Sequence, residues 1–110
     1  MENQKTIDEL YLCAAQCTRC YDACSIEKDN DHLLPCMMLD QDCADMCRLT
    51  AQILERHSES AGKFLKLCSE ICLDCADECS KHAYKHCQQC ADVCRECSEM
   101  CFEQEYHIET

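Results

Sequence analysis

The segment that decides the fold reads CSEICLDCADEC, residues 68–79, and its cysteines are separated by four, three and four positions. Alternating steps of three and four place every member on one face of an α-helix. A strand brings every second residue to one face and would therefore require even steps. The segment predicts a helix with a stripe of thiols along one side.

The same spacing recurs in three other parts of the chain. Residues 13–24 read CAAQCTRCYDAC, and residues 87–101 read CQQCADVCRECSEMC. Residues 36–47 read CMMLDQDCADMC. Continuing the spacing from Cys36 requires an inward-facing residue at position 40, and this residue is Asp40. Four stripes predict four helices, each with its cysteine face turned inward. We interpret Asp40 as a hydrogen-bonded core acid, with an oxygen ligand among sulfurs as the alternative.

Turn and capping signals divide the chain into these helices. Thr6 begins a potential capping box, Asp31 can cap the second helix with Pro35 in its first turn, and Ser58 or Ser60 can cap the third. The connections are short, so consecutive helices should be antiparallel neighbours. The sequence predicts an all-α, up-down-up-down antiparallel four-helix bundle with a cysteine-lined core. The expected single domain covers 1–110, with helices at about 6–28, 32–57, 60–82 and 85–103.

Composition makes the cysteines indispensable to this fold. The chain has 110 residues, of which 16 are cysteine, with one Gly, one Pro and no Trp, and its net charge is −12. Leu, Ile, Val and Phe together contribute only 18 residues. So few large apolar residues at this charge are typical of disordered chains. The thiols must therefore complete the core, either as small hydrophobes or through something bound to them.

Several functional classes are excluded by the same features. Apolar runs are far shorter than the roughly 18 residues of a transmembrane helix. The first residues, MENQKTIDEL, lack the basic and apolar regions of a secretory signal, so we expect a cytoplasmic, reducing location. The acidic balance argues against nucleic acid and anionic membrane surfaces as partners. Without a Gly-rich phosphate loop or a catalytic constellation, the expected protein binds a ligand and is not an enzyme.

The two ends of the predicted bundle differ in chemistry. One end is expected to be an apolar plug made by Leu10, Ile53, Leu54, Phe64, Leu65 and Phe102. At the other end, steps of three and four extend the third stripe from Cys79 to His82 and His86. His32 and Met37 belong to the same end, with Met38 adjacent. We interpret His82, His86, His32 and Met37 as the candidate point of metal uptake.

Inward thiols in this number point to a thiophilic metal. The candidate ligands are Cys13, Cys17, Cys20, Cys24, Cys36, Cys43, Cys47, Cys68, Cys72, Cys75, Cys79, Cys87, Cys90, Cys94, Cys97 and Cys101. Two metal–sulfur bonds of about 2.3 Å span roughly 4.6 Å, so two thiolates four residues apart can clamp one ion near-linearly, as suits Cu(I). One Cu(I) per thiolate also gives a neutral core, whereas one Zn(II) per four thiolates leaves a large buried negative charge.

Two alternatives stay open on the residues alone. Thiolates from several helices can surround Zn(II) or another thiophilic metal tetrahedrally, and spacing does not exclude this arrangement. A metal-free bundle, with or without cross-helix disulfides and with an unknown interaction role, would also account for inward cysteines.

Longer segments of the chain carry a family resemblance. They are LDQDCADMCR at 39–48, CSEIC at 68–72, CADECSKH at 75–82 and HCQQCA at 86–91. In these segments the chain resembles the cysteine-rich four-helix-bundle copper storage proteins, in their cytosolic form, and the resemblance extends roughly from Cys13 to Cys101 and includes Asp40. It implies storage of many Cu(I) ions along the core, uptake at the histidine-bearing end and assembly into a homotetramer. Copper donor and acceptor proteins are the further partners expected.

Overall fold

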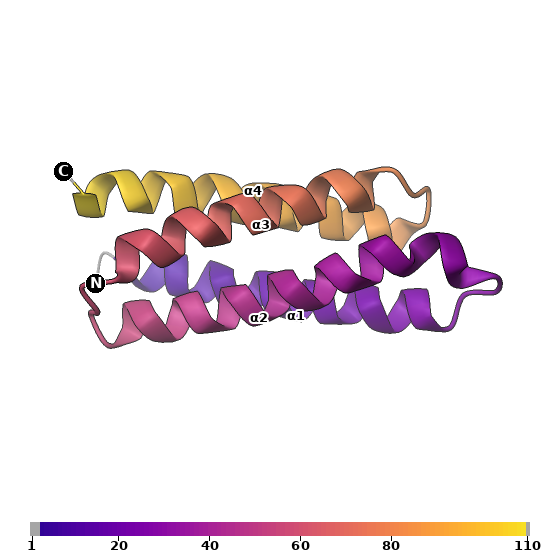
Figure 1. The fold of residues 1–110 in the computed structure, drawn as a ribbon, viewed down its shortest axis with the longest axis horizontal. Coiled ribbons are helices and arrows are strands. Elements are labelled where there is room, and N and C mark those ends of the chain that lie inside the picture. Colours follow the sequence, from indigo (N-terminus) through magenta and orange to yellow (C-terminus); the bar gives the residue numbers. More distant parts are fainter. Residues whose placement is uncertain (1–2, 110) are drawn as a thin grey trace.

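The computed structural model describes residues 3–109 and consists mainly of four long helices (Figure 1). They are α1 (Gln4–Ser25), α2 (Leu34–Glu55), α3 (Ala61–Ser80) and α4 (Lys85–Glu109), with a short 3-10 helix, η1 (Asn30–Leu33), before α2. The molecule measures 46 × 19 × 18 Å along its principal axes. No helix in the described part of the chain has an apolar stretch long enough to cross a bilayer.

Consecutive helices run antiparallel and surround one long axis (Figure 1). The backbones of α1 and α2, α2 and α3, α3 and α4, and α4 and α1 approach each other closely, whereas within residues 3–109 the diagonal pair α2 and α4 meets only through side chains on the axis. The predicted up-down-up-down four-helix bundle is confirmed. We call the end with the connections at 26–33 and 81–84 the histidine end, and the end with the connection at 56–60 and both chain termini the closed end.

The cysteine stripes form the centre of the bundle. All sixteen cysteines are at most 1% exposed. Each stripe follows the 3.6-residue period of its helix, and the four inward faces meet along the whole axis. The chain therefore packs a continuous core with few large apolar side chains, because sulfur occupies the volume that hydrocarbon fills in other bundles.

Hydrocarbon is concentrated at the closed end, as predicted, with one exception. Of the predicted plug residues, Leu10, Ile53, Leu54 and Leu65 are buried there. Phe64 is partly buried against them. The prediction for Phe102 was wrong, since this side chain is 64% exposed. Phe102 directly follows the inward-facing Cys101, and one residue turns a helix by about 100°, which points the ring to the outside.

The connection between α1 and α2 differs from the predicted one. α1 ends at Ser25 and not near residue 28, because Asn30 Nδ2 donates hydrogen bonds of 3.2 Å to the carbonyl oxygens of Cys24 and Ser25. Asp29 then adopts a left-handed conformation with φ of 53°. Asp31 lies inside η1 and does not cap α2, which begins without a side-chain cap. Pro35 lies in the first turn of α2, as expected.

The remaining helix boundaries also differ from the predicted ones. α1 begins at Gln4, so Thr6 is not its cap; the Thr6 hydroxyl instead donates to Gln104 Oε1 of α4, 3.1 Å away. α4 continues to residue 109, beyond the predicted end at 103. α2 ends at Glu55, two residues early, before the left-handed His57. α3 spans 61–80 where 60–82 was expected, and Ser60 precedes it without a side-chain capping bond.

Candidate metal centre

The sulfur atoms of the core are close enough for both expected coordination modes. Within one helix, the Sγ atoms of Cys90 and Cys94 are 3.8 Å apart. Between helices, Cys17 Sγ lies 3.5 Å from Cys94 Sγ, and Cys36 Sγ lies 3.0 Å from Cys79 Sγ. All sixteen are free thiols. An ion bound by two thiolates needs its two sulfur atoms about 4.6 Å apart, so the sulfurs of such a pair would have to move apart only slightly.

Five groups of four side chains bring their ligand atoms within 4.8 Å of one another. From the closed end towards the histidine end, they are Cys13–Cys47–Cys72–Cys97, Cys13–Cys17–Cys43–Cys94, Cys17–Cys75–Cys90–Cys94, Cys20–Asp40–Cys79–Cys90 and Cys20–Cys24–Cys36–Cys87. Every group draws ligand atoms from at least three helices. The bundle therefore assembles ligand sets that no single helix contains.

Neighbouring groups share thiols, and this makes the five groups one continuous system. Cys13 belongs to the first two groups, Cys17 and Cys94 to the second and third, Cys90 to the third and fourth, and Cys20 to the last two. A thiolate that contacts two positions can hold an incoming ion before it releases the neighbouring one. Sequence spacing alone did not reveal this sharing, because it arises from the register between helices.

Cys68 and Cys101 lie beyond these groups at the closed end. Cys68 Sγ is 3.8 Å from Cys47 Sγ and 3.9 Å from Cys72 Sγ, so it remains in contact with the first group. The Cys101 thiol is the largest cause of the lowered pKa of Cys68. These two predicted ligands therefore form the last layer of sulfur before the apolar plug.

Burial raises the pKa of the core thiols, whereas hydrogen bonds from other thiols lower the pKa of some of them. Burial raises the pKa of Cys24 to about 11 and also raises the pKa of Cys87. Hydrogen bonds from the thiols of Cys20 and Cys79 lower the pKa of Cys36 to about 4. A core of buried thiols retains most of its protons without metal, because clustered thiolates repel one another. Metal binding must displace those protons.

Asp40 is the one carboxyl group within the stripes, and it is fully buried. Its Oδ1 accepts thiol contacts of 3.3 Å from Cys90, 3.4 Å from Cys75 and 3.6 Å from Cys79. Burial, reinforced by neighbouring thiolates, raises its pKa to about 10. The geometry agrees with a hydrogen-bonded core acid, and it also places the carboxyl oxygen within reach of an ion held by Cys20, Cys79 and Cys90.

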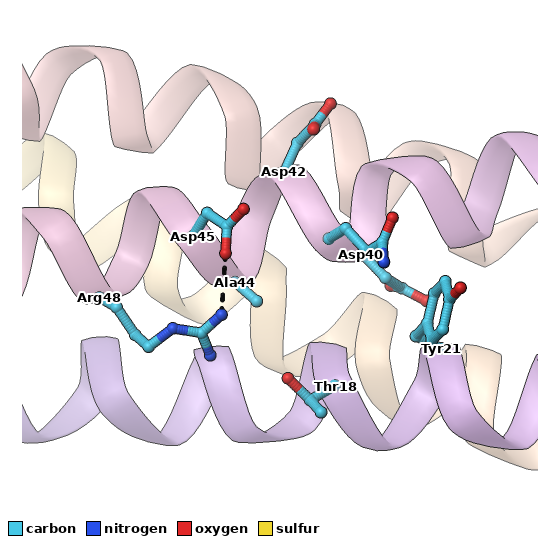
Figure 2. Close-up of a pocket in the computed structure, with 8 residues that line it drawn as sticks. Thr18, Tyr21, Asp40, Asp42, Ala44, Asp45 and Arg48 are labelled. Atoms are coloured by element: carbon cyan, nitrogen blue, oxygen red, sulfur yellow. Dashed lines mark hydrogen bonds and ion pairs between the residues drawn. The ribbon is translucent and has the colours of Figure 1, made fainter.

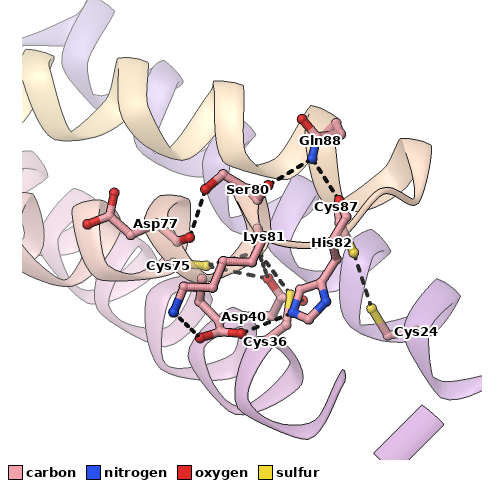
Figure 3. A network of polar contacts seen from close by, with 12 residues as sticks. Cys24, Cys36, Asp40, Cys75, Asp77, Ser80, Lys81, His82, Cys87 and Gln88 are labelled. Atoms are coloured by element: carbon pink, nitrogen blue, oxygen red, sulfur yellow. Dashed lines mark hydrogen bonds and ion pairs between the residues drawn. The ribbon is translucent and has the colours of Figure 1, made fainter. Parts of the chain in front are cut away.

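The histidine end brings imidazole rings against the outermost thiols. His86 Nε2 lies 3.4 Å from Cys24 Sγ, which is itself 3.8 Å from Cys87 Sγ. His82 Nε2 lies 3.0 Å from a carboxylate oxygen of Glu78. Figure 3 draws the Cys24–Cys87 pair, the His82 ring and Asp40 in the same close-up of this end of the bundle. His86 is therefore the imidazole in direct contact with the thiol core.

The other residues predicted at this end are placed differently. His32 is exposed, and its ring lies 5.9 Å from that of His82, measured between centroids. Met37 is buried in the core, whereas Met38 is 64% exposed. Tyr84, which sequence reasoning did not single out, stacks on His86 with ring centroids 5.4 Å apart. Tyr84 lies in the connection between α3 and α4, outside every stripe, so no periodic signal could identify it.

A polar groove on the outside of the bundle borders this core at Asp40. It has a volume of about 400 Å³ and lies between α1 and α2 (Figure 2). Thr18, Tyr21, Asp42 and Arg48 are among its lining residues, and Arg48 pairs with Asp45 at 2.9 Å. No thiol lines it. The candidate metal centre is therefore the axis of the bundle and not its surface.

The fold and the shared thiol groups define a class of protein, the metal-binding four-helix bundles whose core is made of cysteine. More specifically, the chain belongs to the copper storage protein family, whose model matches residues 1–106.

Relatives of the chain include proteins of known structure. It is 38% identical over 86 residues to the uncharacterized cysteine-rich protein YhjQ of Bacillus subtilis, covering 78% of this chain and 80% of that protein. The Cu(I)-bound copper storage protein BsCsp3 is similar with a TM-score of 0.90 and 34% identity, over 94% of this chain and 97% of that one. Ccsp from Streptomyces lividans, loaded with 10 copper equivalents, matches with a TM-score of 0.90 and 38% identity, over 93% and 82% of the two chains.

Proposed function

We propose that this protein stores several Cu(I) ions along the axis of its bundle, bound by the thiolates of all sixteen cysteines from Cys13 to Cys101. The observation that carries the proposal is the continuous run of thiol groups with shared members. A single structural metal needs one such group, whereas this core repeats the group over most of its length. Membership in the copper storage family supports the same function.

Cu(I) explains this core better than Zn(II). Shared thiolates suit a monovalent, thiophilic ion, because one Cu(I) per thiolate neutralises the buried charge. Zn(II) at four thiolates per ion would leave uncompensated negative charge among buried side chains. BsCsp3 and Ccsp are both described with copper, which supports this choice. We infer a cytosolic location, since a relative from Streptomyces lividans is a cytosolic copper storage protein.

Uptake is proposed at the histidine end. His86 contacts Cys24, and Cys24 belongs to the outermost thiol group, so an ion held by the imidazole can be transferred to Cys24 and Cys87. His82, oriented by Glu78, together with His32 and Met37 would support the same step. From there, exchange between thiolates shared by neighbouring groups would carry copper towards the closed end without releasing a free ion.

Storage defines the expected partners. The protein would bind copper without transforming it, so we propose no catalytic residues. Copper donor and acceptor proteins would meet the histidine end, where the thiols are nearest to the surface imidazoles. The family resemblance supports assembly into a homotetramer.

Anaerobic titration of the reduced, metal-free protein with Cu(I) tests the proposed function. We expect uptake of about one ion per thiol against a competing chelator, because each thiolate pairs with a monovalent ion in a neutral core. Saturation at one or two ions per chain would contradict storage. A parallel titration with Zn(II) is the comparison, and tight uptake of about four Zn(II) with weak copper binding would favour the zinc alternative.

The uptake role of the imidazoles predicts a kinetic effect. In the His82→Ala/His86→Ala variant, we expect copper loading to slow several-fold while total capacity changes little, since the thiols are retained. Stopped-flow absorbance of the copper–thiolate bands measures the rate. His57→Ala, at the closed end, is the matched control and should load at the normal rate. Equal loading rates in all three proteins would remove the proposed role.

A further inference from the structure

Thr50 carries a buried hydroxyl that the protein leaves without a partner. Its side chain is fully buried, and Oγ1 makes no hydrogen bond. Among the side chains of residues 3–107, no other buried nitrogen or oxygen is left in this state. An unpaired buried hydroxyl destabilises the folded chain, so its presence in the core calls for a reason.

The hydroxyl is not used by its own helix. Threonine in the middle of a helix commonly donates back to the carbonyl four residues earlier. Thr18 of α1 does so, with its Oγ1 3.0 Å from the carbonyl oxygen of Ala14. Thr50 makes no such bond, and its donor therefore remains available to another group in the core.

The position of Thr50 in the stripe indicates which group that is. Thr50 follows Cys47 by three residues, so it continues the inward stripe of α2 where the next cysteine would fall. On α3 and α4, Cys68 and Cys101 end the stripes at the closed end, and Leu10 of α1 belongs to the plug beside them. Cys68 Sγ lies 3.8 Å from Sγ of Cys47, the residue one helical turn before Thr50, so the Cys68 thiol belongs to the sulfur layer next to Thr50.

We propose that the Thr50 hydroxyl donates a hydrogen bond to the Cys68 thiolate when Cys68 and Cys101 together bind one Cu(I) ion at the closed end. The inference rests on the proposed function, since it assigns a further copper position to the same core. That position lies outside the five groups described above, with a hydroxyl as its supporting polar group.

Charge explains why a donor is needed there. Two neutral thiols that bind Cu(I) lose two protons to solvent and form two sulfur–copper bonds, so the product carries one negative charge, and no electron is transferred. Inside the bundle, thiolates shared between groups spread such charge over several ions. Beyond Cys68 and Cys101 the core is hydrocarbon. A neutral thiol is a weak acceptor, whereas a copper-bound thiolate is a strong one, so the Thr50 hydroxyl gains its partner only on loading.

This reasoning predicts effects of opposite sign in the two states of the protein. Thr50→Val keeps the shape and removes the hydroxyl. In the metal-free protein, we expect the variant to unfold a few degrees higher, because the unpaired polar group is gone. When fully loaded with copper, the variant should have a lower thermal unfolding midpoint than the loaded wild type. It should also bind one copper ion per chain about tenfold to hundredfold more weakly.

Thermal unfolding and chelator competition on the reduced full chain measure both effects. Thr50→Ser retains the donor and should keep the wild-type affinity. Thr18→Val makes the same chemical change on the outside of α1 and should leave copper affinity unchanged. In a Cys68→Ala background, Thr50→Val should no longer alter copper binding, because its acceptor is missing.

The outcomes separate this inference from the proposed function. If wild type binds about sixteen ions but Thr50→Val shifts stability in the same direction in both states and binds copper as tightly as wild type, Thr50 is a packing residue and the inference is overturned. An undiminished Thr50→Val effect in the Cys68→Ala background would also overturn it. Failure of wild type to take up more than one or two ions would instead overturn the storage function itself.

Discussion

Loading the metal-free protein with Cu(I) is expected to raise its thermal unfolding midpoint by more than about 20 °C. The folded bundle brings thiols from at least three helices within 4.8 Å in each group, whereas the unfolded chain scatters the same ligands. A ligand at a thousand times its Kd stabilises the folded state by about 4 kcal/mol per ion, less any binding to the unfolded chain. Each kcal/mol shifts the midpoint of a domain this size by roughly 4 °C or more.

Circular dichroism of anaerobic samples with increasing copper measures this shift. The midpoint should rise through successive additions, because each group filled links further helices. Removal of copper with a strong chelator should return the midpoint to its metal-free value, which serves as the control. Copper that binds without moving the midpoint would show that the ligands are equally available in the unfolded chain, contrary to a preassembled core.

The second large effect is expected in the middle of the bundle. Cys17 and Cys94 are both shared by the second and third thiol groups, so Cys17→Ala/Cys94→Ala removes the two sulfurs that connect the two halves of the core. We expect the closed-end groups to fill more than about tenfold more slowly, since copper must then cross a gap without an exchange partner. Capacity under short loading times should fall to roughly half of the wild-type value.

Cys68→Ala/Cys101→Ala is the matched control, because it also removes two buried thiols but at the far end of the core. This control should lose only about one ion, the one proposed for Cys68 and Cys101, and should retain the early loading phase. Stopped-flow absorbance and copper analysis after gel filtration compare the two variants. Equal losses in both would contradict transfer along the axis and would indicate that each group fills independently from solvent.

Much of the architecture was predictable from periodicity. Steps of three and four depend only on helical geometry, so the stripes, the helix number and the burial of all sixteen cysteines followed from spacing, and short connections led to the antiparallel order. Errors arose where local chemistry overrides the period. Asn30 ends α1 early by capping its carbonyls, and Phe102 turns outward because it is one residue out of phase.

The site was predictable as a set of ligands but not as an arrangement. Residue types and spacing identified the thiols and His86 as candidates. The sharing of Cys13, Cys17 and Cys94 between groups depends on the axial register of one helix against the next, which no single stripe encodes. Tyr84 stacks on His86, two residues further along, through the conformation of the connection that precedes α4, and no stripe encodes this contact.

By itself, then, the sequence determined which faces turn inward, because the helical period acts within about 20 residues and needs no partner. The tertiary structure alone decided which sulfurs meet, since distances between helices follow from packing and register. It also left Asp40 among three thiols and the Thr50 hydroxyl without a partner. Both residues continue the stripe of α2, and only the neighbouring helices define what their polar atoms can contact.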